Sequence, residues 1–196
     1  ACGTFVATGG QLYGPAPVPA GSGLTGLIPY TAVSQSAVTG SGTVADPYKL
    51  ITVVDAGSSG LRLTQTDSYV EGQESFRTDV KVQNTGAGSA DARIWRAGDC
   101  YLQNSDSGCG AVDGATGAVS CVAGTSAGPG ARIEQWYPLS PGSSYFQAGY
   151  SEVWSRIGAH AHGWTKPPDG IVVFGSAARG DGGTASTVVS SSASAS

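Results

Sequence analysis

The chain has 196 residues, of which 31 are glycine and 12% are charged, about half of the charged share usual in soluble globular domains. Its net charge of −4 argues against a nucleic-acid partner, because phosphate recognition needs clustered lysine and arginine. No apolar run approaches the roughly 20 residues of a membrane-spanning helix. The length fits one large domain, or one domain with appendages.

The first 46 residues are rich in glycine, proline and small side chains, and they include the run YGPAPVPAGSG from Tyr13. Proline fixes φ and donates no backbone hydrogen bond, so this run predicts an extended or polyproline II segment. Short strands can form at 24–30 and 31–38. We expect an extended N-terminal arm over residues 1–46.

Strand patterns begin after Asp46-Pro47. The segment 48–54 is β-branched and aromatic, and 61–66 alternates between apolar and polar residues after a turn. The next strand alternates between moderately apolar and polar residues. One of its faces therefore carries Phe76, Thr78, Val80 and Val82.

Turn residues at 84–89 lead from that strand into a second one at 91–96. We expect the two strands to form a hairpin with one solvated face. Such a unit is typical of an antiparallel β-sandwich.

The second half of the chain continues with short elements between glycine-rich loops. Strands are expected at 101–103, 119–123, 131–139 and 171–174. The segment 149–157 fits a short helix, with a strand as the alternative. From Gly180 the sequence is a low-complexity tail that buries little apolar surface. We expect a sandwich domain over 47–175 and a Gly/Ser/Ala-rich tail over 176–196.

Four cysteines allow three disulfide pairings, and none of them forms a CxxC motif. We favour Cys100–Cys121, which brackets a glycine-rich loop, together with Cys2–Cys109, which would tie the N-terminus to that loop. Free buried thiols are the alternative. Closing a loop of about 20 residues stabilises a fold by about 3 kcal/mol in the chain-entropy model. Paired cysteines and a low charge content favour an oxidising, extracellular location.

Five residues between Tyr69 and Gly86 form a recognisable frame, which consists of Tyr69, Gly72, Val82, Asn84 and Gly86. The frame Y-x-x-G followed by V-x-N-x-G resembles Ig-like modules of bacterial secreted and cell-surface proteins. The wider region from Tyr48 to about Trp154, which contains the segment Gly98–Gln103 (GDCYLQ), is similar to secreted actinobacterial β-sandwich proteins. The resemblance covers about half of the chain. It implies a role in adhesion, display or assembly, and it implies no catalytic residues.

Two residue sets are candidate binding sites. Asp99, Asp106 and Asp113 lie in or beside a glycine-rich loop, and oxygen-rich loops suit Ca²⁺, although Asx turns account for the same residues without a metal. The four tryptophans can stack on sugars or anchor a protein partner, or they can belong to the core. They are Trp95, Trp136, Trp154 and Trp164.

These patterns favour a non-enzymatic structural or adhesive protein, secreted or held at the cell surface, with an all-β, antiparallel Ig-like sandwich fold. An extended end segment can add a strand to the open sheet edge of a neighbour, so self-association into a filament is one expected mode of assembly. A carbohydrate-binding module that uses surface aromatics on a polysaccharide is the alternative. A secreted hydrolase is the third hypothesis. No cofactor is expected beyond the candidate calcium ion.

Overall fold

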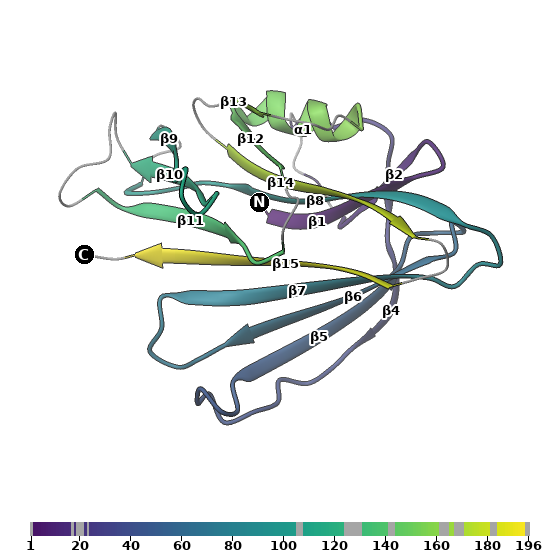
Figure 1. Cartoon of the computed structure of the whole chain (residues 1–196), viewed down its shortest axis with the longest axis horizontal. Coiled ribbons are helices and arrows are strands. Elements are labelled where there is room, and N and C mark those ends of the chain that lie inside the picture. The colour runs from purple at the N-terminus through teal and green to yellow at the C-terminus, as the bar shows by residue number, and fades with distance from the viewer. Residues whose placement is uncertain are drawn as a thin grey trace.

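The computed structural model describes residues 2–16, 18, 22, 24–104, 108–123, 131–140, 144–160, 165–166, 171–180 and 184–194. Two β-sheets lie face to face, and the helix α1 (Tyr150–Gly158) covers the outer face of one of them (Figure 1). The prediction of an all-β, largely antiparallel sandwich is confirmed. No helix in the described part of the chain is long and apolar enough to cross a membrane.

The seven-stranded sheet has the order β13-β12-β14-β8-β1-β2-β3. Its pairs are antiparallel except for β12–β13 and β2–β3. In chain order its strands are β1 (Cys2–Thr8), β2 (Gln11–Gly14), β3 (Leu27–Pro29), β8 (Ala90–Asp99), β12 (Ser144–Ala148), β13 (Thr165–Lys166) and β14 (Ile171–Gly180).

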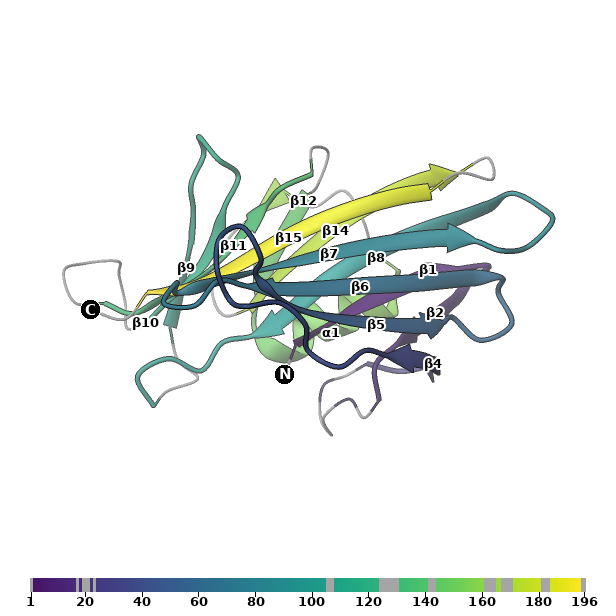
Figure 2. The ribbon, with the colours of Figure 1, turned by 90° about the horizontal axis from the view of Figure 1, so that it is seen from below.

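The eight-stranded sheet has the order β4-β5-β6-β7-β15-β11-β10-β9 and is antiparallel throughout. Figure 2 shows β4, β5, β6, β7 and β15 running side by side across this sheet. In chain order its strands are β4 (Thr31–Gln35), β5 (Tyr48–Asp55), β6 (Leu61–Tyr69), β7 (Ser75–Asn84), β9 (Gly108–Val112), β10 (Val119–Ala123), β11 (Ile133–Pro138) and β15 (Thr184–Ser194).

The helix α1 (Tyr150–Gly158) packs on the seven-stranded sheet through one apolar face. Its buried residues Val153, Trp154 and Ile157 recur at helical spacing, so the helical alternative predicted for this segment is confirmed. Trp154 meets Phe5 of β1 edge to face, with ring centroids 5.5 Å apart. Because the other face of β1 contacts the opposite sheet through Val6, this strand is buried on both sides.

The start of the chain forms a strand of the sandwich and not the separate extended arm expected over residues 1–46. Cys2–Thr8 pairs with both β8 and β2 and therefore lies inside the seven-stranded sheet. The run Gly3-Thr4-Phe5-Val6-Ala7 is buried throughout, which a strand at the centre of a covered sheet requires. The small residues of this segment allow close packing inside the sheet. A Cβ on Gly3, for example, would lie 2.8 Å from Cγ of Pro15.

The C-terminal segment is also a strand of the chain's own sheet. Thr184–Ser194 pairs with β7 on one side and β11 on the other. Residues 176–180 belong to β14, which pairs with β8. The sandwich therefore extends beyond the expected boundaries at 47 and 175 in both directions.

The expected hairpin at 75–96 is wrong, although both of its strands exist. β7 pairs with β6 and β15, whereas β8 pairs with β1 and β14, so the connection at 85–89 crosses between the sheets (Figure 1). The predicted apolar face of β7 is confirmed at Thr78, Val80 and Val82, which are buried. Both faces of β8 are covered along most of the strand, one by α1 and the other by the second sheet.

Candidate binding cleft between the sheets

The inner face of the eight-stranded sheet changes from apolar to polar along β6. Leu61 and Leu63 are buried in the core between the sheets. Gln65 and Asp67 continue the same alternating face, since every second residue of a strand points to one side. Asp67 stands opposite the buried Thr78 of β7. The core therefore ends in a patch of polar side chains.

The facing sheet changes in the same way at the same place. Val6 of β1 and Ile94 of β8 are paired and buried in the core between the sheets. The next inward-facing pair is Thr4 and Arg96. Polar groups of both sheets consequently meet inside the sandwich.

Hydrogen bonds link these groups within each sheet, and the bond between Thr4 and Gln65 crosses the gap between the sheets. Thr78 Oγ1 donates to Asp67 Oδ1 at 2.6 Å, and Gln65 Nε2 donates to Asp67 Oδ2 at 2.8 Å. Thr4 Oγ1 then donates to Gln65 Oε1 at 2.9 Å. Arg96 Nη1 makes a longer contact of 3.4 Å with Thr4 Oγ1. Burial of polar side chains is costly unless they are paired, so this network stabilises a polar site within an otherwise apolar core.

A cleft of about 460 Å³ opens at the polar network. On one side it is lined by Cys2, Thr4, Arg96 and Tyr30. On the other side its lining includes Thr52, Val54, Leu63, Gln65 and Val80. Apolar walls with a few fixed polar groups are the usual composition of a small-molecule or oligomer binding site. We call this space the inter-sheet cleft.

Tyr30 lines the cleft and contributes a phenol hydroxyl to it. Its hydroxyl donates to the backbone carbonyl of Thr4 at 3.0 Å. Burial raises the pKa of the Tyr30 phenol well above its ordinary value, because the anion would lose its hydration. Tyr30 is therefore a neutral hydrogen-bonding group at physiological pH.

A row of aromatic residues lies further along the same inner face. Tyr48, Tyr69 and Phe76 stand opposite one another on β5, β6 and β7. Their spacing from Leu63 and Val80 by even numbers of residues puts them on the cleft side of the sheet. Tyr69 and Phe76 are 39% and 41% exposed, so ring surface is open to a ligand. We call these three residues the aromatic row.

The tryptophans expected as a possible surface platform are core residues where the structure describes them. Trp95, Trp136 and Trp154 are 2%, 3% and 1% exposed. Trp95 is covered by α1, and Trp136 packs against Gly98, where a Cβ would lie 2.6 Å from Cζ2 of the indole. Trp164 lies outside the described residues. These three side chains therefore belong to the core, which was the alternative to a ligand-binding surface.

Of the three candidate calcium residues, the structure describes Asp99 and Asp113, and these two do not belong to a group of metal ligands. Asp113 accepts hydrogen bonds from Thr116 Oγ1 at 2.8 Å and from the Ala115 amide at 2.9 Å, and the Thr116 bond lowers the pKa of the carboxyl. Its oxygens therefore stabilise a turn. Asp99 ends β8, and Asp106 lies outside the described residues. Within the described ranges, no three acidic, histidine or cysteine residues are grouped as metal ligands.

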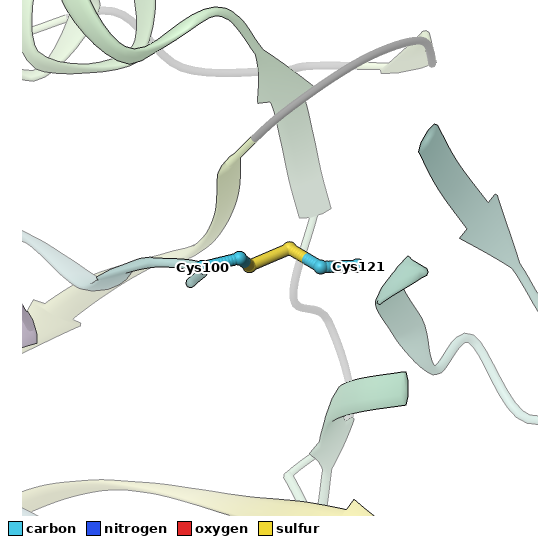
Figure 3. The surroundings of a disulfide bond; sticks show 2 residues. All are labelled: Cys100 and Cys121. Carbon is cyan, nitrogen blue, oxygen red and sulfur yellow. A yellow bond between two sulfur atoms is a disulfide. The ribbon is translucent and has the colours of Figure 1, made fainter. Parts of the chain in front are cut away.

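The predicted Cys100–Cys121 disulfide is present and joins the two sheets (Figure 3). Cys100 follows β8 of one sheet, and Cys121 lies in β10 of the other. The expected Cys2–Cys109 pair is wrong, because both residues are free thiols. Cys2 lies on β1 opposite Gly98, whereas Cys109 lies on β9 at the edge of the other sheet.

Comparisons with known proteins support the fold and give no information on function. No family model and no curated protein matches the sequence. Among solved structures, a crystal structure of a heparan sulfate lyase HepC mutant from Pedobacter heparinus is similar, with a TM-score of 0.51 and 8% sequence identity. The match covers 83% of this chain but only 22% of the lyase. At that identity the likeness shows the fold alone.

Proposed function

We propose that this protein is an extracellular, non-catalytic adhesive module that binds a glycan chain in the inter-sheet cleft. The single observation that carries the proposal is the cleft itself, about 460 Å³ in volume, where polar groups from both sheets meet apolar walls. Hydroxyl and amide groups at Thr4, Thr52 and Gln65 are of the kind that bind sugar hydroxyls.

The aromatic row supports a chain-like ligand over a single small molecule. Sugars present apolar faces that stack on aromatic rings, while their hydroxyls need hydrogen-bond partners. Gln65 and Tyr69 are on the same face of β6, and four residues of strand separate their Cα atoms by about 13 Å. A ligand that reaches both groups must extend over several sugar units.

The extracellular location is supported by the disulfide between the sheets. A structural disulfide is maintained in oxidising compartments and is rare in reducing ones. The non-catalytic role is supported by the chemistry of the cleft. None of the described residues that line it is an acid or a histidine, which are the usual general acids and bases of hydrolases.

A cleft-blocking variant tests the binding site. Ala32 is exposed at the cleft, so Ala32→Trp places an indole in the opening at little cost to the fold. The matched control is Val33→Trp, at an adjacent exposed residue that does not line the cleft. Affinity gel electrophoresis against cellulose, chitin, xylan, α-glucans and acidic polysaccharides identifies a ligand, and calorimetry measures its affinity.

We expect at least one glycan to bind the parent chain and the Val33→Trp chain equally, and to bind Ala32→Trp at least about tenfold more weakly. Circular dichroism confirms that each variant is folded. A flat response of the parent chain to the whole panel would refute glycan binding. Equal affinity of all three chains would show that the glycan binds elsewhere.

A further inference from the structure

Arg96 is an unusual residue for its position in the sandwich. It lies on β8 at the centre of the seven-stranded sheet and is half-buried. Among the described residues that line the inter-sheet cleft, it is the one that carries a charge. The chain has few arginines and a net negative charge, so a cation in this place needs a physical reason.

Three other arginines of the chain are paired with carboxylates. Arg62 binds Asp55 at 2.7 Å, Arg77 binds Asp79 at 2.7 Å, and Arg156 binds Glu152 at 3.1 Å. These pairs lie on exposed or half-exposed surfaces, where ion pairs contribute little.

Arg96 has no such partner among the described residues. Its contact with Thr4 Oγ1, at 3.4 Å, uses one of five N–H donors. Asp67 is the nearest acid in the polar network, but its two oxygens accept hydrogen bonds from Gln65 and Thr78. The guanidinium therefore lines the cleft with most of its donors unused by the described residues.

We infer that Arg96 is the receptor for an anionic group, a carboxylate or a sulfate ester, carried by the bound glycan. The inference rests on the proposed function and adds the substrate class, which is an acidic polysaccharide. A guanidinium matches a planar or tetrahedral oxyanion with two parallel hydrogen bonds. Partial removal from water strengthens that contact relative to the same pair on an open surface.

The test compares acidic and neutral oligosaccharides of equal length on the full chain. Suitable pairs are oligogalacturonate with its methyl ester, and a sulfated glycosaminoglycan fragment with its desulfated, carboxyl-reduced form. Calorimetry is run at low and high salt. The variants are Arg96→Gln and Arg96→Lys, and the control is Arg77→Gln, which removes an equal charge from the outer face of the same sandwich.

We expect the parent chain to bind at least one acidic member about tenfold more tightly than its neutral partner, because hydrogen bonds between charged groups are stronger. The preference falls with added salt. Arg96→Gln binds both members equally, Arg96→Lys keeps part of the preference, and Arg77→Gln keeps all of it. The carboxylate and sulfate pairs distinguish the two sources of the anion.

Three results overturn the inference in distinguishable ways. Equal binding of acidic and neutral glycans by the parent chain removes the acidic specificity but leaves the proposed function intact. A preference that survives Arg96→Gln, in a variant that melts like the parent, assigns the anion to another residue. Binding of no glycan at all refutes the proposed function together with the inference.

Discussion

At the scale of single residues, Thr4 is the link between the two sheets in the polar network. Its hydroxyl donates to Gln65 and accepts the long contact from Arg96, and the residue is 6% exposed. Thr4→Val keeps the shape but leaves the Gln65 carbonyl without its donor. We expect the free energy of unfolding to fall by about 1–3 kcal/mol, measured by urea denaturation. Thr64→Val, on the outward face of β6, is the control and should change stability far less. Equal losses would contradict a special role for Thr4.

Glu134 is a half-buried carboxyl on β11 whose charge disfavours the folded state. Burial raises the pKa of Glu134, and the nearby Asp99 carboxylate raises it further. A folded-state pKa above the unfolded value of about 4.3 stabilises the protein below that pH. The stabilisation is lost as pH rises through the folded pKa, so ionised Glu134 is a penalty at pH 7.

Glu134→Gln should therefore increase stability at pH 7 and change it little below about pH 4. Thermal unfolding across this range measures the difference between the two chains. Glu152→Gln, which removes an exposed carboxylate paired with Arg156, is the control and should show no such gain. A destabilised Glu134→Gln chain at pH 7 would mean that the carboxylate makes a favourable contact when ionised.

At the scale of elements, the Cys100–Cys121 disulfide connects the end of β8 to β10 across a sequence separation of 21 residues. Closing a loop of this size stabilises by about 3 kcal/mol in the chain-entropy model. We expect the double variant Cys100→Ser, Cys121→Ser to lose stability on that order in guanidinium denaturation. The double variant Cys2→Ser, Cys109→Ser should match the parent, because both thiols are free. A comparable loss in the second variant would indicate that those two cysteines are paired in solution.

The sequence predicts the strands whose two faces differ and misses those whose two faces are alike. Val80 and Val82 alternate with exposed residues, so β7 is evident from periodicity. β1 is buried on both faces, so its residues do not alternate between apolar and polar, and Gly3–Ala7 shows no strand periodicity. The pairing of β7 with β15 was not predictable, because the serine-rich tail has no apolar period that would mark a strand.

The cleft was partly visible in the sequence. The face that begins with Leu61 and Leu63 continues with Gln65 and Asp67, and this break from apolar to polar in one strand phase is a usable signal. Arg96 carried no comparable signal, because its role depends on pairing with Thr4 from a segment more than 90 residues away. The burial of Trp95 could not be predicted either, because the helix that covers it is distant in sequence.

At the scale of the whole molecule, both terminal segments are structural parts of the sandwich. β15 fills the position between β7 and β11, so its removal would leave two unpaired strand edges. A chain that lacks residues 184–196 should aggregate or unfold without a cooperative transition, whereas a chain that ends at Ser194 should melt like the parent. Size-exclusion chromatography and thermal unfolding distinguish these outcomes. A soluble, cooperative truncated chain would mean that β15 is dispensable.

Self-assembly by strand exchange remains a prediction. β1 and β15 pair within the same chain, so a swapped oligomer would have to replace pairings that one molecule already makes. Concentration-dependent elution of the full chain would support exchange. Monomeric elution over a wide concentration range would count against it.

The position of β15 also predicts how the eight-stranded sheet is completed during folding. The eight-stranded sheet holds two groups of strands, β4 to β7 and β9 to β11, that become continuous only when this strand inserts between them. Such long-range pairings fold slowly, on the order of milliseconds to seconds, because loop closure precedes any gain from contacts. We expect β15, which comes last in chain order, to pair late, and until it does each group of strands presents an open edge to any other chain nearby.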